Sequence, residues 1–216
     1  MERYSERENR TGSNVSYDEI AETIFGPLYQ DIAAAMLERT GVRRGKLLDA
    51  GCGGGHMGLA VCAQGDFQGV LMDLSPDAVS RALESILERG FADRLRAVCA
   101  NVEDMPFPDD EFDLVVSRGS VFFWENKEKA FREIHRVMKP GAWAYIGGGM
   151  GSRQHRERVH AAMEERGIRP RRRSMSNTFT DQEYEELFQR MQVRYRIIRN
   201  DDEGHWVLFQ KITESI

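Results

Sequence analysis

The sequence is poor in the features that mark secreted, membrane-spanning and metal-stapled proteins. It holds only three cysteines, Cys52, Cys62 and Cys99, with no CxxC pair, so neither a disulfide framework nor a cysteine-rich zinc site is expected, and we predict no metal site. No segment approaches the roughly 18 apolar residues of a spanning helix. Residues 1–14 lack the apolar stretch of a secretory signal. These absences predict a protein of the reducing cytoplasm.

Basic charge is not in excess either. The 216 residues carry 30 Lys+Arg and 35 Asp+Glu, a formal net charge of −5. Proteins that coat nucleic-acid phosphates normally show a basic surplus, as do peripheral membrane proteins. The basic run 169–173 is more typical of a solvated loop than of a surface that steers an anionic acceptor or a nucleic acid. Nucleic-acid and membrane partners are therefore not expected.

Short apolar runs alternate with amphipathic segments through the middle of the chain. The predicted strands are 47–50, 69–73, 95–100, 112–117 and 142–146, and the predicted helices are 56–63, 76–89 and 125–138, with Pro140-Gly141 ending the last helix. This alternation is typical of βαβ units and of a parallel sheet covered by helices on both faces.

The two ends of the chain do not show this alternation of strands and helices. Helices are predicted from Tyr17, with Ser16 as cap, to the Gly26-Pro27 break, and then over 28–40, 154–166 and 181–191. Two strands follow at 193–199 and 205–211. The connection between them is too short for a crossover helix, so they should pair antiparallel as a hairpin.

The first predicted strand ends in a glycine loop with the pattern Asp49-x-Gly51-x-Gly53-x-Gly55. Four glycines in the five residues 51–55 favour a backbone that approaches a ligand closely and turns into a helix N-terminus, although a loop without a ligand stays an alternative. The dinucleotide pattern GxGxxG fails at its last member, which is His56. Asp73, which closes the second strand, suits the two hydroxyls of a ribose; its alternative role, capping the next helix, already belongs to Ser75.

Four segments carry a family resemblance. They are LLDAGCGGG, GVLMDLSPDAV, ANVEDMPFPDDEFDLVVS and AFREIHRVMKPGAWAYIGGG, and together they span residues 46–148. In order and separation they resemble the core of class I S-adenosylmethionine-dependent methyltransferases, closest to the small-molecule branch typified by ubiquinone/menaquinone-biosynthesis-like enzymes. The resemblance implies a Rossmann-like, doubly wound α/β fold. Its seven-stranded sheet is mostly parallel, with an antiparallel last strand and helices on both faces.

The resemblance also implies a division of the chain. We expect a flexible arm at 1–14 and a single domain at 15–216. Within that domain lie N-terminal lid helices at 15–41, a cofactor-binding core at 46–148, a lid segment at 149–191 and the hairpin at 193–212.

By the same resemblance, the cofactor is S-adenosylmethionine and the product S-adenosylhomocysteine. Gly51, Gly53 and Gly55 would line the methionine part, with Asp49 orienting the loop. Asp73 would bind the ribose, and Met72 and Leu74 would lie beside the adenine. Asn101 and Val102 replace the family's usual Asp-Ala pair, so Asn101 would accept from the adenine amine without charge assistance. Ser117 would face the methionine amine.

The acceptor is expected beside the end of the fourth strand. Arg118 there could pair with an acidic group of the acceptor, or with Asp113 or Glu125 as a structural ion pair. Phe122, Phe123 and Trp124 could form an apolar wall or belong to the core. Tyr17 is the second candidate catalytic residue; Phe25, Tyr29, Met150 and His155 are further candidates for the lid.

The function predicted from the sequence is methyl transfer from S-adenosylmethionine to a small molecule. Three alternatives remain: methylation of a nucleic acid or protein, cofactor binding without methyl transfer, and a nicotinamide-dependent oxidoreductase. The lack of an Asn/Asp-Pro-Pro-Tyr stretch and the acidic net charge disfavour the first, and His56 disfavours the last.

Overall fold

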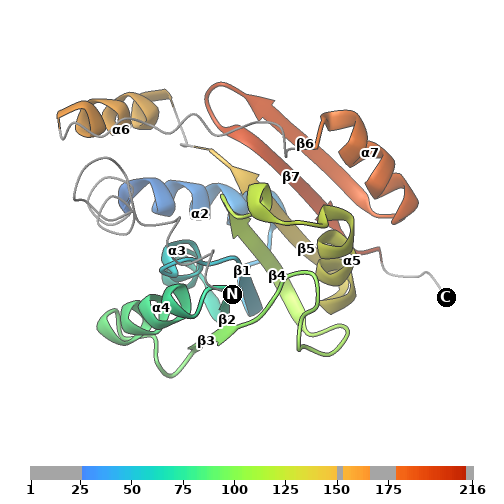
Figure 1. Ribbon diagram of the computed structural model, residues 1–216, viewed down its shortest axis with the longest axis horizontal. Coiled ribbons are helices and arrows are strands. Elements are labelled where there is room, and N and C mark those ends of the chain that lie inside the picture. Colours follow the sequence, from blue (N-terminus) through green and yellow to red (C-terminus); the bar gives the residue numbers. More distant parts are fainter. Residues whose placement is uncertain (1–25, 150–152, 166–178, 213–216) are drawn as a thin grey trace.

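The computed structural model describes residues 26–149, 153–165 and 179–212, and this part of the chain forms a seven-stranded sheet in the order β3-β2-β1-β4-β5-β7-β6 (Figure 1). The strands are β1 Arg44–Ala50, β2 Asp66–Asp73, β3 Leu95–Cys99, β4 Phe112–Arg118, β5 Met138–Gly148, β6 Arg194–Asn200 and β7 Gly204–Gln210. Strands β1 to β5 pair in parallel, and β7 is antiparallel to both of its neighbours. The predicted fold class and the C-terminal hairpin are confirmed.

Helices cover both faces of the sheet (Figure 1). They are α2 Gly26–Thr40, α3 His56–Gln64, α4 Pro76–Glu88, α5 Lys127–Val137, α6 Arg153–Glu165 and α7 Asp181–Arg190, with a short 3-10 helix η1 at Val121–Phe123. Apolar side chains of α2, α3, α4 and α6 pack with one face of the strands, and those of α5 and α7 pack with the other. Alternate residues of each strand therefore enter two separate cores.

Local sequence signals account for where several helices begin and end. The Ser75 hydroxyl accepts from the Ala78 N–H at 3.3 Å, and Pro76 occupies the first turn of α4. Thr180 and Glu183 form a reciprocal capping box at the start of α7. Gly41 adopts a left-handed φ of 70° just after α2, as a helix-ending glycine does.

Strand β5 begins earlier than predicted. It starts at Met138, so Pro140-Gly141 lies inside the strand rather than before it. Pairing with β4 shifts register after Phe112↔Met138 and resumes at Leu114↔Trp143. The Gly141 N–H donates to Lys211 O at 2.8 Å, and Gly141 has a φ of 83°. Proline and a left-handed glycine are thus accommodated as an irregularity within the strand.

Some predictions fall outside the described residues. These are the arm at 1–14, the helix from Tyr17 with its Ser16 cap, and the basic run at 169–173. None of the helices that the structure describes is long and apolar enough to cross a membrane.

Candidate functional site

The glycine loop lies at the carboxyl ends of β1 and β2, between Ala50 and the first residue of α3. The Gly51 and Cys52 N–H groups both donate to Met72 O, at 2.7 and 2.9 Å, which fixes the loop to the end of β2. Gly51, Gly53 and Gly55 have φ values of 73°, 54° and 85°. Side chains other than hydrogen are strained in this left-handed region, so the loop's shape depends on its glycines.

The three glycines differ in what surrounds them. A Cβ on Gly51 would collide with the Ser120 side chain, and one on Gly55 would approach Leu71 Cδ1 to 2.8 Å. No atom lies within 4 Å of the Cβ position of Gly53. The loop is therefore packed on its inner side and open at Gly53, where a ligand can reach its backbone.

Asp73 joins the glycine loop to the start of α4. One carboxylate oxygen accepts from the Gly53 N–H at 2.9 Å and the other from the Ser75 N–H at 3.0 Å. Each carboxylate oxygen can accept more than one hydrogen bond. Half-buried Asp73 thus retains capacity for the two hydroxyls of a ribose while it shapes the loop.

Asp49 is a fully buried carboxyl group beneath the loop. Its Oδ2 accepts from the Gly58 N–H at 2.7 Å, one of the backbone donors left free at the N-terminus of α3. Its Oδ1 is buried without a hydrogen-bond partner among the described residues. Burial, with a smaller contribution from the charge of Asp73, raises the pKa of Asp49 to about 7. A buried acceptor of this kind is suited to a donor or cation on a bound ligand.

The predicted adenine-side residues lie at the ends of β2 and β3. The Asn101 side-chain oxygen accepts from the Glu103 N–H at 2.9 Å, and the Asn101 backbone oxygen accepts from Asp104 at 3.0 Å. Leu74 is 55% exposed, so its side chain is open to a ligand beside Asp73.

The side chains predicted beside the adenine and the methionine amine are buried at three positions, Met72, Val102 and Ser117. The Met72 side chain is buried in the core on the α5 side, and only its carbonyl contacts the glycine loop. The Ser117 hydroxyl is fully buried, 2.6 Å from that of Ser120, which in turn donates to Ala50 O at 3.0 Å. Any direct contribution from Met72 and Ser117 therefore comes from their backbone.

Sequence reasoning missed Ser120. Its side chain fills the space left by the absent Cβ of Gly51 and ties the turn after β4 to the end of β1. A serine three residues after Ser117 was the available signal. Its partner, however, is 70 positions away in the sequence.

Arg118 reaches across the site toward helix α2. It donates to the Tyr29 hydroxyl and to Gly149 O, each at 3.1 Å, and its guanidinium lies 4.6 Å from the centre of the Tyr29 ring. Tyr29 also stacks with His56, with ring centres 5.3 Å apart. The alternative ion pair with Asp113 is not formed, because Asp113 accepts instead from the backbone of Lys46 and from the Lys139 ammonium.

The aromatic stretch after β4 divides between core and surface. Trp124 is buried against Phe131, Phe122 is half-buried, and Phe123 is 62% exposed. Phe123 is therefore the most exposed ring of the three. Tyr17, Phe25 and Met150 lie outside the described residues, as does the side chain of His155.

A hollow of about 370 Å³ lies at the opposite ends of the strands. It is lined at the starts of the strands by residues of both charges, among them Lys46, Arg94 and Glu111. Its position is far from the glycine loop, so we do not assign the chemistry to it. Among the described residues, no group of three or more His, Cys, Asp or Glu side chains is placed to hold a metal ion.

Comparison with known proteins gives a consistent family. The model of the methyltransferase domain family matches residues 48–146. A ubiquinone/menaquinone biosynthesis C-methyltransferase from Azotobacter vinelandii is 32% identical over 128 residues, 58% of this chain and 51% of the relative. A malonyl-[acyl-carrier protein] O-methyltransferase from Methylovorus is 34% identical over 120 residues, 52% of this chain and 40% of the relative. The chain thus spans about half or less of the length of these curated relatives.

Solved structures extend the likeness over nearly the whole chain. A Methanococcus maripaludis protein provisionally described as an S-adenosylmethionine-dependent methyltransferase is 34% identical, with a TM-score of 0.82 and 92% of each chain covered. A geranyl diphosphate C-methyltransferase from Streptomyces coelicolor, solved with S-adenosylhomocysteine, has a TM-score of 0.66 at 15% identity over 94% of this chain and 85% of that one. The latter likeness concerns the fold alone.

Proposed function

Because this chain belongs to the class I S-adenosylmethionine-dependent methyltransferase family, we propose that it transfers a methyl group from that cofactor to a small-molecule acceptor and releases S-adenosylhomocysteine. The observation that carries the proposal is the contact between the glycine loop and Asp73. The 2.9 Å hydrogen bond from Gly53 to Asp73 joins the backbone that would cradle the methionine part to the carboxylate that would hold the ribose.

The residues present fit this cofactor. The unpartnered, buried Oδ1 of Asp49 offers an acceptor to the cofactor's ammonium, directly or through a water molecule. Gly53 leaves space for the cofactor to approach the loop, and exposed Leu74 offers an apolar wall for a base. These three features lie at the carboxyl ends of β1 and β2. A ligand that joins a nucleoside to an amino acid needs such binding groups side by side.

Each residue then has a defined task. Gly51, Gly53 and Gly55 let the loop backbone line the methionine part, and Asp73 accepts from the ribose hydroxyls. Leu74 and Asn101 form the adenine end, while Met72, Val102 and Ser117 contribute through their backbone. Bound S-adenosylmethionine supplies a methyl group activated by a positive sulfur, so the protein has mainly to align the acceptor and exclude water.

The acceptor would enter beside Arg118, Phe123 and helix α2. Arg118 supplies positive charge at this wall, and Phe123 supplies an exposed apolar ring. A small acceptor with an acidic group suits that combination. Tyr17 stays a prediction as a second catalytic residue. Two relatives whose names give quinone biosynthesis and a malonyl group support a small acceptor over a nucleic acid.

Calorimetric titration of the wild-type chain with S-adenosylhomocysteine and with NADH tests the proposal. Binding of the first and none of the second is expected. Asp73→Ala should weaken S-adenosylhomocysteine binding by about 10- to 100-fold, as the loss of a charged hydrogen bond of roughly 1.5–3 kcal/mol implies. Asp77→Ala is the matched control, because Asp77 is exposed one turn away in α4. Equal affinity in wild type and Asp73→Ala would contradict the site.

Methyl transfer itself needs a separate measurement. Incubating the chain with methyl-labelled cofactor and a panel of small aromatic and aliphatic acids should give a labelled acid. Label transferred only to RNA or protein would support the alternative acceptor class. Tight cofactor binding with no acceptor in any class would favour cofactor binding without methyl transfer.

A further inference from the structure

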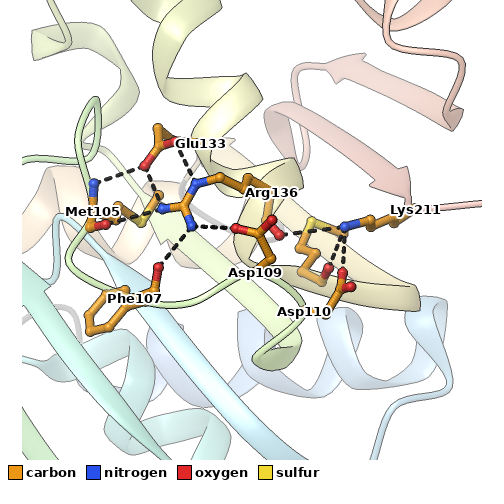
Figure 2. Close-up of polar contacts among 8 residues, drawn as sticks. Met105, Phe107, Asp109, Asp110, Glu133, Arg136 and Lys211 are labelled. Carbon is orange, nitrogen blue, oxygen red and sulfur yellow. Dashed lines mark hydrogen bonds and ion pairs between the residues drawn. The ribbon is translucent and has the colours of Figure 1, made fainter.

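An arginine junction binds the long connection between β3 and β4 to helix α5 (Figure 2). Arg136, in the last turn of α5, has five N–H donors, and all five are used. The Nε–H donates to Glu133 Oε1 at 2.7 Å. Nη1 donates to Phe107 O and Asp109 Oδ1, both at 2.8 Å. Nη2 donates to Met105 O at 3.1 Å and to Glu133 Oε2 at 2.8 Å.

Glu133 completes the junction. Its Oε2 also accepts from the Met105 N–H at 2.9 Å, so both backbone polar groups of Met105 are held, one by the carboxylate and one by the guanidinium. The hydrogen bonds from Arg136 lower the pKa of Glu133, which keeps the carboxylate charged at neutral pH. The pair is half-buried, where a bidentate arginine–carboxylate contact is strong and geometrically specific.

The junction reaches the proposed cofactor site through the backbone. The Glu103 carboxylate accepts from the N–H of Asn126, the capping residue of α5, at 2.7 Å. The Asn101 side chain accepts from the Glu103 N–H. The segment 101–105 is therefore tied to α5 at two points, through Glu103 to the capping residue Asn126 and through Met105 to the Arg136 junction at the other end of the helix.

This connection has little regular structure of its own. Residues 100–111 contain neither helix nor strand beyond one isolated bridge between Asn101 and Asp104. A connection of this length would be mobile without side-chain anchors, and ordering it on ligand binding would cost affinity. The junction, together with the buried side chains of Val102, Met105 and Phe107, removes that cost in advance.

We infer that Arg136 and Glu133 are positioning residues for base recognition: they hold segment 101–105 so that Asn101 can accept from the 6-amino group of the cofactor's adenine. The inference rests on the proposed function. The Asn101 oxygen accepts one backbone hydrogen bond already and has a second lone pair for the base. The direction in which the Asn101 side-chain oxygen points depends on segment 101–105, which the junction fixes.

The test compares two ligands that differ at one group. S-adenosylhomocysteine carries a 6-amino group, and S-inosylhomocysteine carries an oxygen there, which would repel the Asn101 oxygen. The dissociation constant of S-inosylhomocysteine divided by that of S-adenosylhomocysteine measures base recognition. A purely structural loss lowers both affinities without changing this ratio. Arg136→Lys keeps the charge but loses the planar fork. We expect the ratio to fall by about threefold to tenfold, the worth of about one hydrogen bond.

Two further variants make the result decisive. Glu133→Gln should lower the ratio in the same direction, because an amide nitrogen then faces a donor. Arg132→Lys is the matched control: Arg132 lies on the same helix, but its guanidinium donates to exposed Glu128 at 2.7 Å rather than to the connection between β3 and β4. Its ratio should equal that of wild type.

An unchanged ratio in Arg136→Lys and Glu133→Gln would overturn the inference, even if both variants melt at a lower temperature. Equal wild-type affinity for the two ligands would overturn it too, because no base recognition would then exist to be positioned. Neither result touches the proposed function, which is tested separately by the binding of S-adenosylhomocysteine to wild type and by the transfer of label to a small acid.

Discussion

Asp49 couples the proposed site to pH. With a pKa raised to about 7, its buried carboxyl is largely neutral at pH 6 and largely ionised at pH 8. If the ionised form pairs with the cofactor's ammonium, affinity for S-adenosylhomocysteine should rise as pH rises through about 7. Titrations at pH 6, 7 and 8 measure this. Asp49→Asn should bind more weakly at pH 8 and show a flatter profile. Asp66→Asn, exposed at the opposite end of the sheet, is the control.

The same shift predicts the sign of a stability effect. The folded-state pKa of Asp49 lies above its ordinary value of 3.8, so folding takes up a proton between these values. The contribution of Asp49 to stability without ligand is therefore complete below about pH 4 and is lost as pH rises toward 7. The difference in free energy of unfolding between Asp49→Asn and wild type should grow in favour of the variant over this range. A difference independent of pH would contradict the raised pKa.

Asn101 is where this chain departs from the family pattern, and it gives a second residue-level prediction. Asn101→Asp should keep or tighten S-adenosylhomocysteine binding, because a charged acceptor forms the stronger hydrogen bond with an amine and retains the bond from Glu103. Asn101→Leu removes both and should weaken binding. Calorimetry separates the cases: a loss in Asn101→Asp as large as in Asn101→Leu would mean that Asn101 faces something other than the base.

Among single residues, sequence patterns predicted that the glycine loop and Asp73 lie together, and the structure joins them, because they lie at adjacent strand ends. Sequence patterns could not show which way Met72 and Ser117 point. Strand alternation gives two faces, but the choice between core and cleft at a strand's last residue depends on what packs over it. For Ser117 that is Ser120, and for Met72 it is the core beneath α5.

At the scale of elements, Arg118 and Tyr29 connect β4 to helix α2. Arg118→Met removes two hydrogen bonds and a cation–ring contact, so the free energy of unfolding should fall by about 1–3 kcal/mol. S-adenosylhomocysteine affinity should change by less than about twofold, because Arg118 bonds neither the glycine loop nor Asp73. Once an acceptor is known, its KM should rise.

Thermal melting and calorimetry check this pair of expectations. Arg43→Met serves as control, since Arg43 is exposed before β1. A parallel loss of cofactor affinity in Arg118→Met would show that Arg118 shapes the cofactor side of the cleft instead of binding an acceptor.

Element boundaries were predictable where capping chemistry is local, as at Ser75, Thr180 and Gly41. They were missed where a distant partner decides. Pro140-Gly141 usually ends an element, but here Lys211 accepts the Gly141 hydrogen bond and the strand continues around the irregularity. Proline and glycine alone do not carry that information.

At the scale of the whole molecule, the hairpin shows how side-chain character places strands. Strand β7 holds four consecutive buried residues, Trp206 to Phe209, and lies inside the sheet between β5 and β6. Strand β6 exposes arginines at 194, 196 and 199 and forms the edge. A continuous apolar run favours an interior strand, and charges favour an edge. Both signals were present in the sequence, although the hairpin pattern by itself did not give the strand order.

Phe131 contacts several elements on this side of the sheet at once. Its ring lies 5.6 to 6.0 Å, centre to centre, from those of Trp124, Tyr184, Phe188 and Phe209, which come from the turn after β4, from α7 and from β7. Phe131→Ala should lower the free energy of unfolding by about 3–5 kcal/mol, because the cavity would open between three elements that cannot all move inward.

Unfolding of wild type and Phe131→Ala in denaturant, followed by two independent spectroscopic signals, measures this loss of stability. Leu87→Ala, at a 59% exposed position on α4, should change stability by no more than about 0.5 kcal/mol. If Phe131 joins the elements as described, both probes should report one transition, shifted to lower denaturant in the variant. Two separated transitions would mean that the hairpin and α7 unfold independently of the cofactor-binding half, and that the two cores of the sheet are not one cooperative structure.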